Sequence, residues 1–119
     1  MPVSIERDDR PWGYYEVFDE GVGFRVKRIC VSPGQRISYQ RHLLRSEHWY
    51  VVSGKGVVTV DDLERSVEPG DSCDIKIGSS HRAANPGTRD FVFIEIQTGS
   101  YFGEDDIERL QDDYERGPR

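Results

Sequence analysis

The chain has 119 residues, of which 32% are charged and 35% hydrophobic, and its formal net charge at pH 7 is −6. This length predicts one domain with one core. The sequence has no run near the ~20 apolar residues that a membrane helix needs, and no basic stripe typical of nucleic-acid binding. We therefore expect neither a membrane nor a nucleic-acid partner. The first ten residues lack the apolar segment of a secretory signal, so a cytoplasmic location is expected.

Short runs rich in Val, Ile, Tyr and Phe alternate with turn residues at a spacing of roughly 8–12 residues. This pattern is typical of an all-β sandwich or barrel, and the Gly, Pro and Asp residues between the runs favour tight turns. The predicted strands, in chain order, are Tyr14–Phe18, Phe24–Val31, Gln35–Arg41, Glu47–Val52, Gly56–Val60, Leu63–Val67, Ser72–Ile77, His81–Asn85 and Phe91–Thr98. They define a core of about residues 10–99 within a single domain, 1–119.

The C-terminal segment has a different composition. Residues 104–116 contain seven acidic residues and two arginines, a net charge of −5, whereas the rest of the chain has fifteen acidic and fourteen basic residues, a net charge of −1. Ile107, Leu110 and Tyr114 follow a helical spacing. A short C-terminal helix is therefore predicted from Ser100 to Arg116, either packed against the body or solvated.

Two cysteines and two tryptophans lie within or beside the predicted strands. Cys30 and Cys73 have no paired spacing, and we expect buried free thiols rather than a disulfide or a metal pair. Trp12 and Trp49 are expected to be packing residues rather than platforms for a sugar ring.

Four polar residues form a candidate metal site. Gln40 and His42 are two residues apart, so in a strand both side chains point to the same side of the sheet. Glu47 follows across a turn, and His81 comes from a distant segment. This mixed nitrogen and oxygen set suits Zn²⁺, Co²⁺, Mn²⁺ or Fe²⁺. The alternative is that the histidines are hydrogen-bonded core residues. His48 should point to the opposite side and is not expected to be a ligand.

The spacing of these residues resembles the two sequence motifs of the cupin superfamily. The first is Gly34-x5-Gln40-x-His42-x4-Glu47-x6-Gly54, with Gln40 where most cupins have histidine. The second is Gly70-x7-Gly78-x2-His81-x3-Asn85. The resemblance implies a cupin jelly-roll β-barrel, or double-stranded β-helix.

Two narrower signatures, within a likeness that covers about residues 10–115, resemble the type II mannose-6-phosphate isomerase domain. They are Arg45-Ser-Glu-His-Trp49 and Gly99-Ser-Tyr-Phe-Gly-Glu-Asp-Asp-Ile107. That domain usually forms the C-terminal part of bifunctional mannose-1-phosphate guanylyltransferases. The resemblance implies one divalent metal per chain, most often Zn²⁺ with Co, Mn, Fe or Ni as alternatives, and interconversion of mannose 6-phosphate and fructose 6-phosphate.

Isomerisation through an enediolate needs a base and a group that stabilises the developing oxyanion. Arg45, Glu95 and Lys27 are the candidate catalytic residues. Glu95 is either the base or a partner that orients a metal ligand. Arg45, Arg82 and Lys27 are the candidate substrate-binding residues. Arg45 matches the family signature, whereas Lys27 and Arg82 are candidates for binding phosphate by charge alone.

Two other functions stay open. One is a non-catalytic sugar- or metabolite-binding cupin module, which Leu43 and Leu44 favour because the isomerases often have aromatic or histidine residues there. The other is a different cupin enzyme, such as an oxygenase or an epimerase. Gln40 argues against the oxygenase, and the epimerase would not need the four candidate ligands together. A homodimer is expected, as is a separate nucleotidyltransferase partner.

Overall fold

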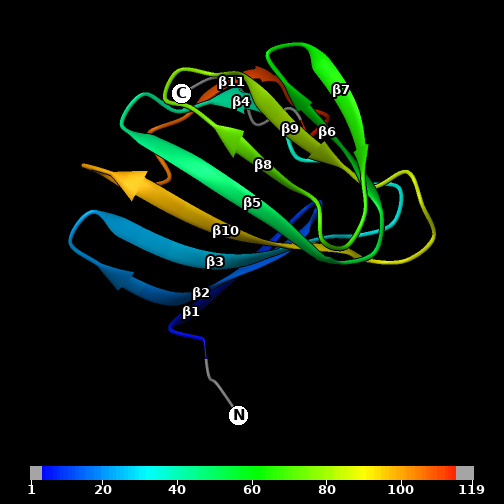
Figure 1. The fold of residues 1–119 in the computed structure, drawn as a ribbon, viewed down its shortest axis with the longest axis horizontal. Coiled ribbons are helices and arrows are strands. Elements are labelled where there is room, and N and C mark those ends of the chain that lie inside the picture. The colour runs from blue at the N-terminus through cyan, green and yellow to red at the C-terminus, as the bar shows by residue number, and fades with distance from the viewer. Residues whose placement is uncertain (1–3, 115–119) are drawn as a thin grey trace.

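A computed structural model describes residues 4–114, which form eleven β-strands and no helix (Figure 1). The strands are β1 (Glu6–Arg10), β2 (Gly13–Gly21), β3 (Phe24–Val31), β4 (Tyr39–Arg41), β5 (Arg45–Ser53), β6 (Gly56–Val60), β7 (Leu63–Val67), β8 (Ser72–Ile75), β9 (His81–Ala84), β10 (Phe91–Gly99) and β11 (Glu108–Gln111).

The strands form two antiparallel sheets that face each other (Figure 1). The larger sheet has the order β1-β2-β3-β10-β5-β8, and the smaller has the order β11-β4-β9-β6-β7. Neighbours in each sheet are often distant in sequence, as in β3-β10-β5, which is typical of a jelly roll. The predicted all-β jelly-roll barrel is confirmed.

The hydrophobic core fills one end of the space between the sheets. Along β10 the buried residues alternate with partly exposed ones, so Phe91 and Phe93 point inward while Val92 and Ile94 point outward. Trp49 packs against Phe93 with ring centroids 4.5 Å apart. Val31 and Val51 complete this end of the core from the neighbouring strands.

The other end of the interior is polar. The antiparallel register places Glu95 opposite both Lys27 on β3 and Trp49 on β5. In the next row, Gln97 lies opposite Glu47. All five side chains are buried. Because buried polar groups need partners, this end of the barrel is where a polar site can form.

Most predicted strands are observed, and the differences lie at the edges. Gln35–Arg41 is mostly not a strand, because only Tyr39–Arg41 pairs regularly and Arg36 forms an isolated bridge with Ala84. The strand β1 was not predicted. Its sequence, Glu-Arg-Asp-Asp-Arg, lacks β-forming side chains, but it pairs along its whole length with β2 at the edge of the sheet.

The predicted C-terminal helix is wrong for residues 100–114, and residues 115 and 116 lie outside the described part. The acidic residues of this segment make specific tertiary contacts instead of covering a helix. Glu108 pairs with Arg41 at 2.8 Å, and β11 adds to the edge of β4. Leu110 is largely exposed while Tyr114 packs against the core, so the helical spacing does not mark a common face.

The cysteine and tryptophan predictions agree with the structure. Cys30 and Cys73 are both free, the first buried and the second partly buried. Trp12 and Trp49 belong to the hydrophobic core. Within residues 4–114 we find no helix of the length and apolar character that crossing a membrane would require.

Two turn glycines differ in the space around them. Gly34 and Gly54 have nearly equal positive φ angles, 76° and 74°. A Cβ at Gly34 would meet nothing within 4 Å, whereas a Cβ at Gly54 would collide with the carbonyl oxygen of Asp90. We predict that Gly34→Ala lowers the free energy of unfolding by about 1–2 kcal/mol, and Gly54→Ala by roughly 3 kcal/mol or more. Urea denaturation measures both, and equal losses would contradict this packing.

Candidate functional site

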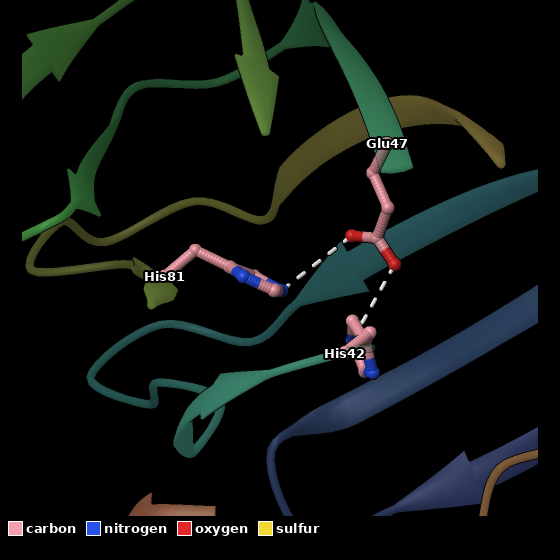
Figure 2. Close-up of side chains that lie close together, drawn as sticks. All are labelled: His42, Glu47 and His81. Carbon is pink, nitrogen blue, oxygen red and sulfur yellow. Dashed lines mark ion pairs between the residues drawn. The ribbon is translucent and has the colours of Figure 1, made fainter. Parts of the chain in front are cut away.

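The fold brings three of the predicted metal ligands together from separate segments. His42 directly follows β4, Glu47 lies on β5, and His81 begins β9. The fourth, Gln40, lies on β4 and pairs with His81 across the sheet. Figure 2 shows the Glu47 carboxylate between the two imidazole rings, with one oxygen facing each ring. The short turn at Leu43–Leu44 therefore carries the chain from one sheet to the other beside the site.

The ligand atoms of these three residues are close and buried. The Nε2 atom of His42 lies 3.5 Å from Oε2 of Glu47, and Nε2 of His81 lies 3.6 Å from Oε1. All three ligand atoms lie within 4.8 Å of one another. The side chains of the three residues are at most 3% exposed.

Both imidazoles are oriented through their Nδ1 atoms. Nδ1 of His42 lies 2.5 Å from the carbonyl oxygen of Asp106, and Nδ1 of His81 lies 3.0 Å from that of Ser79. Because carbonyls only accept, each Nδ1 carries the proton and each Nε2 presents a lone pair. Nε2 of His81 is buried and has no hydrogen-bond partner among the described residues. Metal-binding histidines are commonly oriented in this way.

The protonation states also suit a cation. Burial lowers the pKa of His42 to about 4 and also lowers the pKa of His81. Burial alone would raise the pKa of Glu47, but His81, His42 and Arg45 together outweigh it and lower the pKa to about 2. At neutral pH the site therefore holds two neutral imidazoles and one carboxylate, which are the forms that bind a metal.

The spacing of the three residues suits a small divalent ion. Zn²⁺ binds nitrogen and oxygen ligands at about 2.0–2.2 Å, so two tetrahedral ligands lie about 3.4 Å apart. Each imidazole lies close to this separation from one carboxylate oxygen, His42 at 3.5 Å from Oε2 and His81 at 3.6 Å from Oε1. All three ligand atoms lie within 4.8 Å of one another. Together with the unpartnered Nε2 of His81, this geometry fits a divalent metal ion held by His42, Glu47 and His81.

Gln40 completes the set of predicted ligands, with its amide nitrogen toward the site. Its Nε2 lies 3.3 Å from Nε2 of His42, and its Oε1 accepts a hydrogen bond from the Ser38 hydroxyl at 2.6 Å. Half a turn of the amide would present the oxygen to the ligand atoms. The Ser38 hydroxyl can then accept instead of donate, so it supports either orientation.

Charged and polar groups link the three residues to the rest of the polar end. Arg45 donates from Nε to Oε2 of Glu47 at 3.0 Å and from Nη2 to Nε2 of His42 at 3.2 Å. The Trp49 indole donates to both Glu47 and Glu95 at 3.1 Å. Burial and the nearby charge of Glu47 raise the pKa of Glu95 to about 8. A carboxyl group that titrates near neutrality suits acid–base chemistry.

A cavity of about 60 Å³ lies beside this network. Its lining includes Gln40, Arg45, Lys27, Glu95 and Glu104, whereas His42, Glu47 and His81 do not line it. The structure therefore places Arg45, Lys27 and Glu95 together, next to the candidate metal ligands.

Arg82 and His48 lie elsewhere. Arg82, on β9, donates to the carbonyl oxygen of Ile37 at 3.0 Å and to the side chain and backbone of Gln111, so it links β11 to β9 within the smaller sheet. The structure does not bring it to the cavity. His48 is 42% exposed at its side chain and pairs with Asp74 at 2.6 Å on the outer face, as the strand alternation predicted.

Three contacts of the site were not predicted from the sequence. Asp106 accepts from the backbone amides of Leu43 and Leu44 at 3.0 Å while its own carbonyl orients His42. Trp49 serves as a hydrogen-bond donor as well as a core residue. Glu104 reaches Lys27 and Arg45. Both acidic residues belong to the Gly99–Ile107 signature, and that run was the available signal, although it was interpreted as a helix.

Comparison with known proteins identifies the family of the chain. A family model described as "Mannose-6-phosphate isomerase C-terminal" matches residues 5–112. The chain belongs to this family. The family is of the cupin type, in agreement with the jelly-roll fold.

Two relatives illustrate the family's context. The chain is 53% identical over 107 residues to the alginate biosynthesis protein AlgA of Pseudomonas aeruginosa. This alignment covers 90% of this chain and 22% of AlgA. It is 42% identical over 107 residues to a mannose-1-phosphate guanylyltransferase of Salmonella montevideo, and this alignment covers 90% of this chain and 23% of that protein. The chain thus spans less than a quarter of each relative.

A solved structure supports the fold. The capsular polysaccharide assembling protein CapF from Staphylococcus aureus aligns with a TM-score of 0.78 and 24% sequence identity. The alignment covers 89% of this chain and 34% of that chain. At this identity the likeness concerns the fold alone.

We predict that His81→Ala lowers the affinity for Zn²⁺ by roughly 100-fold or more, because it removes a ligand rather than one of the outer contacts that typically change affinity 10- to 100-fold. His48→Ala is the matched control, since it removes an imidazole from the outer face of the same barrel. Competition with a chromophoric chelator measures both affinities. Equal affinities for the two variants would contradict the site.

Proposed function

We propose that the chain is a metal-dependent sugar-phosphate isomerase domain that interconverts mannose 6-phosphate and fructose 6-phosphate. The observation that carries the proposal is the buried carboxylate between two neutral imidazoles, directly beside a cavity that Lys27, Arg45 and Glu95 line. Membership in the family supports the choice of substrate.

The proposed division of roles follows from position. His42, Glu47 and His81, with Gln40 as the fourth ligand, would hold one divalent metal, with Zn²⁺ as the first choice. A metal held there would supply Lewis-acid chemistry at the sugar oxygens. Lys27 and Arg45 provide positive charge for the phosphate and for the developing oxyanion.

Glu95 is the proposed base. It lies on β10 between Lys27 and Trp49, its side chain is buried, and it lines the cavity. In this role its carboxylate removes the C2 proton of the open-chain aldose, and the same proton returns to C1 to give the ketose. A second proton moves from the C2 hydroxyl to O1. The hydrogen bond from Trp49 at 3.1 Å would hold the carboxylate in place during these transfers.

The second candidate function is a non-catalytic cupin module that binds a sugar phosphate. One observation favours it. Leu43 and Leu44 are 60% and 44% exposed and bring no polar atom of their side chains to the site.

The relatives suggest a setting for either function. Because a mannose-1-phosphate guanylyltransferase of Salmonella montevideo is among the relatives and the chain spans 23% of it, we infer that a nucleotidyltransferase unit works together with this domain. The homodimer expected from the sequence remains a prediction, and the exposed edges of β1, β8, β7 and β11 are the places where strands of a second copy could add.

A coupled assay that follows conversion of mannose 6-phosphate to fructose 6-phosphate tests the proposal. We expect turnover by the metal-loaded protein and none by His81→Ala. Glu95→Gln should keep one bound ion per chain while kcat falls by about 10²–10⁴-fold, which is the usual range for loss of a general base.

His48→Ala is the control and should retain the activity of the unchanged protein. If the metal-loaded protein binds mannose 6-phosphate without converting it, the binding-module function replaces the isomerase. Full activity of Glu95→Gln would remove Glu95 from the mechanism.

A further inference from the structure

Two buried cations at the cavity share one carboxylate. Lys27 and Arg45 are each 3% exposed at their side chains and come from β3 and β5. Glu104 lies 3.0 Å from Nζ of Lys27 and 3.7 Å from Nη1 of Arg45. Among the described residues, Glu104 is the only carboxylate within ion-pair distance of Lys27. Lys27 therefore depends on a residue from outside the larger sheet, whereas Arg45 also pairs with Glu47 at 3.0 Å.

Glu104 approaches these cations from the solvent side. Its side chain is 43% exposed, in contrast to both partners. It lies in the segment between β10 and β11, which contains no strand. The backbone of this segment also contacts arginines, because the carbonyl oxygen of Phe102 accepts from Arg25 and Arg45 at 3.4 Å each. The segment thus covers the polar end of the barrel and inserts one negative charge.

The environment of the two cations is suited to an anion. Arg10 and Arg109 also line the cavity, which gives four basic residues against two acidic ones, Glu95 and Glu104. Lys27 additionally lies over the ring of Tyr15, 4.2 Å from its centroid. A buried lysine and a buried arginine at one point favour a doubly charged ligand group, since an arginine fork and a lysine ammonium both match phosphate oxygens.

Space at this point is limited. The cavity of about 60 Å³ is below the roughly 300 Å³ at the lower end of ligand pockets. Glu104 and Ile107 line it from the covering segment. A ligand whose anionic group reaches Lys27 and Arg45 must therefore take the place of the Glu104 carboxylate.

We propose that Lys27 and Arg45 form the subsite for the phosphate group of the ligand, and that Glu104 occupies this subsite as an internal competitor until the ligand displaces it. The choice of a phosphorylated ligand rests on the proposed function. Glu104 then sets the affinity for anions, because a weakly bound anion cannot displace it and a phosphate with further sugar contacts can.

Removal of the competing charge tests this inference. If Glu104 occupies the subsite in about nine of ten molecules, Glu104→Gln should bind inorganic phosphate about tenfold more tightly than the unchanged chain. Calorimetric titration of the full chain with inorganic phosphate measures this without any turnover. In the same variant, phosphate should raise the melting temperature more than it does in the unchanged chain, because it replaces the lost partner of Lys27.

Glu108→Gln is the matched control. It removes a carboxylate that pairs with Arg41 at 2.8 Å and lies only four residues away, and it should leave phosphate affinity unchanged. Adding Lys27→Met to Glu104→Gln should abolish the tenfold gain. Should Glu104→Gln not fold, Glu104→Asp, whose shorter side chain cannot reach both cations equally, should show a smaller gain in the same direction.

Unchanged or weaker phosphate binding by the folded Glu104 variants would overturn the inference. Titration with mannose 6-phosphate and with mannose separates the two sources of the phosphate group. If Glu104→Gln binds mannose 6-phosphate more tightly than the unchanged chain does, but binds mannose equally, the subsite acts on the phosphate group of a sugar phosphate. A gain for phosphate in a chain without isomerase activity would refute the proposed catalysis and leave the subsite standing.

Discussion

The polar end of this barrel depends on a buried carboxylate that faces two imidazole lone pairs. Removing Glu47, His42 and His81 from water costs free energy, and a group of acceptors without a positive partner would be strongly destabilising. Arg45 supplies part of the compensation through its bonds to Glu47 and His42. A divalent ion would supply the rest at the point where the lone pairs converge. The arrangement is therefore best understood as a cation site rather than as part of an ordinary core.

This constraint explains the surrounding contacts. Each imidazole is fixed by a backbone carbonyl, one from Ser79 next to β9 and the other from Asp106 in the segment before β11. The Trp49 indole connects Glu47 to Glu95, so the candidate metal ligand and the proposed base are held by one donor. The apolar half of the barrel supports this arrangement, because Trp49 itself packs on Phe93.

Local patterns were sufficient to predict the centre of the fold and which polar residues the fold brings together. Strand alternation predicted that Gln40 and His42 point to one side of the sheet and that His48 points to the other. The spacing of the two cupin motifs added Glu47 and His81 to the candidate ligands. The same reasoning failed where pairing depends on distant residues. The segment from Ser100 has helical spacing, but its acidic residues form ion pairs with Lys27, Arg45 and Arg41 in other strands. Long-range ion pairs of this kind leave no periodic signal in the sequence.

The charge of a side chain alone did not predict which basic residues lie at the cavity. Lys27 and Arg82 were equal candidates for phosphate binding, yet Lys27 lines the cavity while Arg82 holds β11 in place. Their different positions follow from the strand pairings, since Lys27 lies opposite Glu95 on the inner face of the larger sheet. No local feature of the sequence distinguishes the two residues.

We propose that one divalent ion binds between His42, Glu47 and His81. Anomalous diffraction at the zinc edge, from crystals of the Zn²⁺-loaded protein, tests it most directly. We expect one peak per chain, about 2.0–2.2 Å from Nε2 of both histidines and from a Glu47 oxygen, with the Gln40 amide oxygen turned toward it. A peak at the exposed pair of His48 and Asp74 instead, with none between the three buried residues, would contradict it.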